Sequence, residues 1–386
     1  MNHQDYSGGT GRRPRWPHYF GFPRGVDVQT VGALVVAMTL TACGGTREND
    51  EATLSEGSLD LAIEQLTDAT VVSAATNMAT EVETLRSEIA SFCSSPDADS
   101  LSGLQSQWQN TALAWYQLLP FNLGPLDDDL VFPNYQFIDS YRLRGTDYTE
   151  TIRTDIDGWL VSDDTLDGDF FAGLAFNKVG LLALEVGLFE TAADQDSTAA
   201  EVLSEFVNQP RKCDVIDGLA EALERRTDDV RDDWTVSYGD NEQSYRDLFL
   251  AGELEDGSTP LVTLLTGVQE YLDYLDQRDV VNNVAQLSAS DSFDRWSLMT
   301  ASMDSIEAIL AGATTEQVSL FELMTAGGNA SSVATVESNI AAAREAISSL
   351  DSTSFNALAA TLDGNFKRDI PDSLDVSLGI NFSDGD

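Results

Sequence analysis

The sequence predicts an all-α protein. Apolar residues recur at intervals of three and four along most of the 386-residue chain, which is the spacing of helices with one buried face. No stretch shows the strict alternation of a half-buried strand, and no short-period repeat is present. Long helices with short breaks predict a domain over 58–386 built of two bundle-like halves, about 58–240 and 241–386.

Residues 1–43 have the pattern of a targeting segment. Four arginines precede the apolar run 31–42, which is too short to span a bilayer. The run ends in Leu-Thr-Ala-Cys at residues 40–43, the pattern of a bacterial lipobox, and this predicts a signal peptide with lipidation at Cys43. An ordinary secretory signal with an incidental cysteine is the alternative. No Asp follows Cys43, so we expect an outer-membrane lipoprotein, facing the periplasm or the cell surface, on an acidic tether over 44–57.

The domain itself is expected to consist of helices separated by proline, glycine and polar breaks. Pro96 follows the first helix, Pro120 ends the second, and Pro210 stands at the start of a long one. Residues 121–141 are expected to be an irregular aromatic connection, with a turn at Gly124 and an acidic run at 127–129. The expected helices cover 59–92, 101–119, 148–160, 168–190, 198–208, 210–234, 245–250, 260–276, 293–311, 317–325, 332–350 and 355–362.

The predicted helix over 168–190 is apolar on nearly every face, which is typical of a helix inside a protein. Gly173, Gly180 and Gly187 are spaced seven apart and would allow neighbouring helices to approach closely. Glu185 is an acid in the middle of this run. A carboxylate in such a setting must be paired, protonated or bound to a ligand.

Three interpretations of Glu185 are open. In the first, Glu185 is a general base, which needs a nucleophile or a metal-bound water as partner. In the second, Glu185 is a ligand-binding carboxylate in a cleft between the halves, together with Asp139, Arg142 or the acidic run 127–129. Oxygen ligands of this kind suit calcium, magnesium or ferric iron. In the third, Glu185 is a structural acid paired with Arg142 or Arg144.

Charge and histidine content exclude several function classes. The chain has 65 acidic and 21 basic residues, a net charge of −44, and only three lysines. DNA and anionic membrane surfaces would repel it, so no nucleic-acid partner is expected. The acidity predicts a halophilic surface, and a cation-collecting surface is the alternative. Both histidines lie before residue 43, which excludes a Ser-His-Asp triad or a His-ligated zinc site from the mature chain.

Cys93 and Cys213 form an even pair in an exported chain, and a disulfide between them is the expectation. Two buried free thiols are the alternative. Trp108, Trp115 and Trp159 either wall a pocket or belong to the core.

Several motifs, in this order, resemble those of imelysin-like lipoproteins. They are the lipobox, Phe92-Cys93-x-x-Pro96, Trp108-x6-Trp115, Gly124-Pro125, Gly180-x-x-x-Leu184-Glu185, Arg211-Lys212-Cys213, and Leu378 to Phe382 near the end of the chain. The resemblance implies two four-helix-bundle-like halves. It also implies an association with peptidases and with iron uptake. The family marker is G-x-H-x-x-E, and in this sequence Leu182 occupies the position of the histidine. This GLxALE form is similar to that of a lipoprotein branch of the family.

The resulting hypothesis is an exported, lipid-anchored, non-catalytic helical binding protein in metal or iron acquisition. Its candidate ligand-binding residues are Glu185, Asp139, Arg142, Trp115 and Gly180, with Glu185 as the candidate ligand of iron or another hard cation. Its expected partners are the membrane, through the anchor on Cys43, and an envelope protein or metal ligand. An imelysin-type peptidase and a structural or adaptor lipoprotein of the envelope are the alternatives.

Overall fold

Helices account for the regular secondary structure that the computed structural model describes, which confirms the all-α prediction. The described residues are 56–127, 133–139, 148–194, 196–254, 257–277, 280–281 and 296–378, and no strand occurs among them. They belong to one compact unit, Asp50–Asp386. Cys43, the tether up to residue 55, Asp128, Asp129, Arg142 and Arg144 lie outside the described residues.

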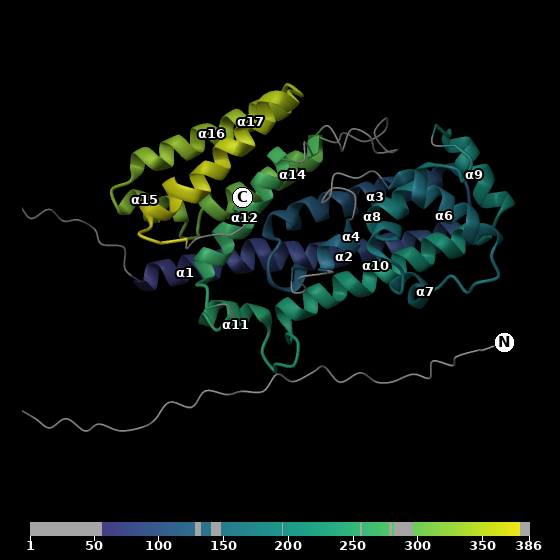
Figure 1. Cartoon of the computed structure of the whole chain (residues 1–386), viewed down its shortest axis with the longest axis horizontal. Helices are drawn as coiled ribbons and strands as arrows, with labels where there is room; N and C mark the ends of the chain where they lie inside the picture. Colours follow the sequence, from purple (N-terminus) through teal and green to yellow (C-terminus); the bar gives the residue numbers. More distant parts are fainter. Residues whose placement is uncertain are drawn as a thin grey trace, which may run out of the picture. The chain divides into compact units, whose positions relative to one another are not determined.

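One group of helices surrounds the middle of the sequence. The helices α2 (Ser73–Ser94) and α3 (Ala98–Leu118) form an antiparallel pair, and α10 (Arg211–Thr235) packs along α2. The shorter helix α8 (Gly180–Phe189) lies against both α3 and α10 (Figure 1). The helices packed around these four are α6 (Thr149–Val161), α7 (Gly168–Ala172) and α9 (Ala199–Asn208).

A second group of helices follows in the sequence. Its members pack on one another and are α12 (Pro260–Gln277), α14 (Trp296–Ala311), α15 (Leu320–Ala326), α16 (Ala330–Ser348) and α17 (Ser352–Gly364). Packing of α14 on α3 joins the two groups (Figure 1). At this contact the Tyr271 hydroxyl donates to Ser302 Oγ at 2.6 Å, and Ser302 Oγ donates to the Tyr116 carbonyl at 2.8 Å. A boundary between halves near residue 240 stays a prediction.

The remaining elements are short helices and turns. They are α1 (Glu56–Leu66), η1 (Thr67–Val72), η2 (Leu119–Phe121), η3 (Gly124–Leu126), α4 (Asn134–Ile138), η4 (Phe176–Lys178), α11 (Tyr245–Ala251), η6 (Asn365–Asp369) and α18 (Ile370–Ser373). The π-helical turn η1 joins α1 to α2, so the first predicted helix is continuous but contains a wider turn. No described helix is both long and apolar enough to cross a bilayer.

Two of the expected elements are wrong in detail. The single helix over 168–190 is in fact α7, η4 and α8, because the chain leaves the helical conformation after Gly173 and Gly180 has a φ of +80°. A positive φ of this size cannot continue a right-handed helix. The connection over 121–141 contains the five-residue helix α4, which is too short to give a periodic signal.

The predicted disulfide between Cys93 and Cys213 is present and joins the end of α2 to the start of α10. Its cysteines are 120 residues apart in sequence, so the bond closes a long loop of the unfolded chain. Such a loop stabilises the folded state by restricting the unfolded one.

Replacing both cysteines by alanine is therefore expected to lower the free energy of unfolding by about 4–5 kcal/mol. Urea unfolding of both proteins at equal salt concentration measures this difference. A change smaller than about 1 kcal/mol would show that the bond stabilises the fold little by restricting the unfolded chain.

Candidate functional site

The helix α8 is buried along its whole length. Every residue from Gly180 to Phe189 is buried, including Glu185, whose exposed fraction is 0%. Glu185 takes part in a polar or electrostatic interaction, so it is not a free carboxylate. An acid enclosed in this way must gain from its partner or ligand what it loses in hydration.

The N-terminal end of α8 touches the backbone of α4. A Cβ atom on Gly180 would lie 2.4 Å from the Phe137 carbonyl oxygen and 2.5 Å from that of Ile138. Glycine is therefore required twice at this position, by the close approach and by the positive φ. The contact fixes α4 against the start of α8 and places Asp139, which follows Ile138, beside this end of the helix.

Two tryptophans of α3 reach the same region. The Trp108 indole Nε1 donates to the Leu181 carbonyl oxygen at 3.1 Å, and the Trp115 indole Nε1 donates to Asp139 Oδ2 at 3.2 Å. Both rings are fully buried, and Asp139 is 2% exposed. The tryptophans are thus core residues that also hold α8 and α4 in place.

The structure therefore brings three of the predicted site residues together: Gly180, Trp115 and Asp139. Glu185 lies on the same helix, five residues after Gly180 and so about 7.5 Å further along its axis. Arg142 lies outside the described residues, and its predicted role stays a prediction.

Three consecutive residues at the start of α10 hold three other helices, α6, the C-terminal end of α8, and α2. Arg211 Nε donates to the Trp159 carbonyl oxygen at the end of α6, at 2.9 Å. Lys212 Nζ donates to the carbonyl oxygen of Glu190, the residue that ends α8, at 2.8 Å. Cys213 forms the disulfide to α2. Cations near helix C-termini are favoured by the helix dipole.

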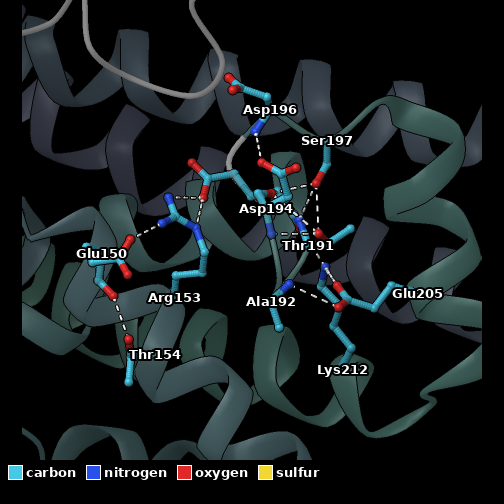
Figure 2. Close-up of polar contacts among 11 residues, drawn as sticks. Glu150, Arg153, Thr154, Thr191, Ala192, Asp194, Asp196, Ser197, Glu205 and Lys212 are labelled. Atoms are coloured by element: carbon cyan, nitrogen blue, oxygen red, sulfur yellow. Dashed lines mark hydrogen bonds and ion pairs between the residues drawn. The ribbon is translucent and has the colours of Figure 1, made fainter.

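Figure 2 shows the charged cluster that forms around Lys212. Lys212 pairs with Glu205, while Arg153 pairs with Glu190 at 2.6 Å and with the exposed carboxylate of Glu150. The side chains of Lys212 and Glu190 are 1% and 2% exposed. Burial lowers the pKa of Lys212, and the neighbouring carboxylates of Glu205 and Glu190 act in the opposite direction. The cluster holds α6, the end of α8, α9 and α10 together.

Sequence analysis missed this cluster. Its members come from four separate elements, so no local pattern connects them. A lysine directly before a disulfide cysteine, in a chain with three lysines, is the one signal that was available.

An open groove of about 410 Å³ lies beside the cluster, between the loop 191–197 and α9. Its side chains bond mainly to one another and to nearby backbone. Glu201 accepts from the Thr198 backbone N–H in the cap of α9, and the Thr191 backbone N–H donates to Ser197 Oγ at 3.0 Å. A second cavity, of about 10 Å³, is lined by Gly180, Phe137 and Arg226, and is large enough for about one water molecule.

Three observations concern the chemical groups that the described part of the chain offers. Over the described ranges, no three His, Cys, Asp or Glu side chains lie close enough together to hold a metal ion. Cys93 and Cys213 are oxidised, so neither is a nucleophile. Leu182, at the position of the marker histidine, is 3% exposed and packs in the core.

Comparisons with known proteins give a family and a fold. The model of peptidase family M75, imelysin, matches residues 71–372, which is more than half of the chain. Among solved structures, an imelysin-like protein from Psychrobacter arcticum 273-4 is similar with a TM-score of 0.60 and 15% identity, over 84% of this chain and 98% of that one. A putative iron-regulated protein A precursor from Parabacteroides distasonis ATCC 8503 is similar with a TM-score of 0.56 and 13% identity, over 83% and 96%. No curated protein matches.

The contact at Gly180 predicts that Gly180→Ala lowers the free energy of unfolding by roughly 2–4 kcal/mol, because the new methyl group meets two carbonyl oxygens and φ is positive. Gly103→Ala is the matched control, since Gly103 lies in α3 with no atom within 4 Å of its Cβ position. That variant is expected to be as stable as the wild type or slightly more stable. Equal stability of the two variants in urea unfolding would contradict the assigned contact.

The charged cluster predicts that Lys212→Met lowers the free energy of unfolding by about 3–5 kcal/mol, because it leaves the carboxylate of Glu205 without its cation. The double variant with Glu205→Gln is expected to recover much of this loss. Lys367→Met, which removes a more exposed pair with Asp363, is the control and is expected to cost less than about 1 kcal/mol. A single Lys212 variant as stable as this control would show that the buried pair contributes little.

Proposed function

The chain belongs to the imelysin family, and from this premise we propose that it is an exported, lipid-anchored, non-catalytic binding protein whose ligand is a hard cation, ferric iron in the first place. The observation that carries the proposal is the complete burial of Glu185 in an otherwise apolar helix. Burial of a carboxylate costs free energy unless a partner or a ligand compensates for the lost hydration, so we expect an acid at this position to have a function.

The ligand chemistry follows from the residues at hand. Glu185 and Asp139 offer carboxylate oxygens, the donors that hard cations prefer, whereas zinc and copper favour histidine or cysteine. Since the described residues contain no cluster of three such ligands, they would fill only part of the coordination shell. We expect water or a chelator bound to the iron to fill the rest. The name of one structural neighbour, a putative iron-regulated protein A precursor, supports iron as the cargo.

The N-terminal sequence supports the proposed location. The lipobox ending at Cys43 and the acidic residues after it support a lipid anchor and a short tether at the outer membrane. The anchor would hold the strongly acidic domain close to a membrane whose surface repels it.

A peptidase is the second candidate, because the matching family model carries a peptidase name. The sequence argues against a peptidase, because Leu182 occupies the position of the marker histidine and no histidine follows His18. A carboxylate alone would have to activate water without the group that the marker supplies.

Equilibrium dialysis of the full mature chain against ferric nitrilotriacetate, in molar KCl, tests the proposal. The salt screens binding by the acidic surface. We expect saturable one-to-one binding that falls at least about tenfold in Glu185→Gln, because a neutral amide replaces a charged ligand. Asp139→Asn should also weaken binding, and it preserves an oxygen acceptor for the Trp115 indole.

Glu83→Gln, at an exposed position of α2, is the matched control and should bind as the wild type does. Absence of saturable binding by the wild type, or equal binding by Glu185→Gln, would refute the cation ligand. Cleavage of an unfolded protein by the wild type, abolished in Glu185→Gln, would favour the peptidase.

A further inference from the structure

The helix α4 depends on its neighbours for its position. It has five residues, Asn134–Ile138, and a single helical turn of this length is not stable by itself in water. At its C-terminal end Asp139 accepts the Trp115 hydrogen bond, and its backbone packs on Gly180. These contacts fix one end and one side of the helix.

Arg226 of α10 holds the remaining part of α4. Its guanidinium carbon lies 4.2 Å from the centroid of the Phe137 ring, and its Nη1 donates to Asn134 Oδ1 at 2.5 Å. The Asn134 amide in turn donates from Nδ2 to the Pro125 carbonyl oxygen at 2.8 Å. Arg226 thus contacts the first residue of α4 and the fourth at the same time.

This double contact needs an arginine. A planar guanidinium can stack on an aromatic face while its edge donates a directed hydrogen bond. A lysine ammonium is a compact charge and can satisfy one of these contacts well but not both. Arg226 also lines the one-water cavity with Gly180 and Phe137, so it lies at the junction of α4, α8 and α10.

We propose that Arg226 is a positioning residue: through Asn134 and Phe137 it sets the place of α4 and hence of the Asp139 carboxylate beside α8. Its effect on cation binding rests on the proposed function, whereas its effect on the Asp139–Trp115 hydrogen bond does not. Loss of a group that orients a ligating carboxylate typically weakens metal affinity by about 10–100-fold.

The test reads the Trp115 indole directly. In the full mature chain with ¹⁵N-labelled tryptophan, the Nε1–H resonance of Trp115, assigned with Trp115→Phe, reports its bond to Asp139. The resonance of Trp108, which bonds to α8 instead, is the internal reference. We expect Arg226→Met to shift the Trp115 resonance and leave that of Trp108 in place, with Arg226→Lys and Asn134→Ala giving smaller shifts in the same direction.

Arg225→Met is the matched control. It removes the same charge from the neighbouring position of α10, where Arg225 pairs with Asp169 and Glu221 and not with α4. It should leave the Trp115 resonance unchanged, and ferric binding should fall about tenfold or more in Arg226→Met but not in Arg225→Met.

Three results would overturn the proposal: an unchanged Trp115 resonance in Arg226→Met, equal shifts of Trp108 and Trp115, or no rescue by Arg226→Lys. If Arg226→Met does not fold, the first two criteria apply to Asn134→Ala and Arg226→Lys. A selective Trp115 shift in a chain that binds no ferric iron would support the positioning role and refute the proposed function alone.

Discussion

Complete burial of α8 is the constraint on which the rest of the structure depends. A ten-residue helix that is apolar on all sides needs neighbours on all sides, and α3, α6 and α10 provide them. Burial also requires that the polar groups at both helix ends find partners within the protein. At the C-terminal end Lys212 donates to the Glu190 carbonyl oxygen, which has no partner within the helix, and near the N-terminal end Trp108 donates an additional hydrogen bond to the Leu181 carbonyl oxygen.

The two ends are held by different kinds of interaction. At the N-terminal end, contact with α4 is close and needs the absence of a side chain at Gly180. At the C-terminal end, Lys212 of α10 donates a charged hydrogen bond to the Glu190 carbonyl oxygen, and the adjacent disulfide ties α10 to α2. Glu185 lies between them, so its position is set by packing along the helix and not by the loops around it.

The sequence predicted the long helices well because their buried stripes are periodic. The spacing of apolar residues located the continuous run of α1, η1 and α2, as well as α3 and α10, to within a few residues, and an even cysteine pair in a chain expected to be exported predicted the disulfide. Periodicity failed over 168–190, because a run apolar on every face has no period to interrupt. Only the backbone shows that Gly180 has a positive φ and begins a new helix.

The site was predictable residue by residue but not as an arrangement. Glu185 was recognisable as an acid among apolar residues, and Gly180 as a point of close approach. That Asp139 bonds to Trp115, or that Arg226 stacks on Phe137, depends on helices far apart in sequence and leaves no local pattern.

Enclosure of Lys212 has one more consequence. Its amine is inaccessible in the folded protein while Lys178 and Lys367 remain partly exposed, so acylation at Lys212 is an internal reporter of the opening of α10.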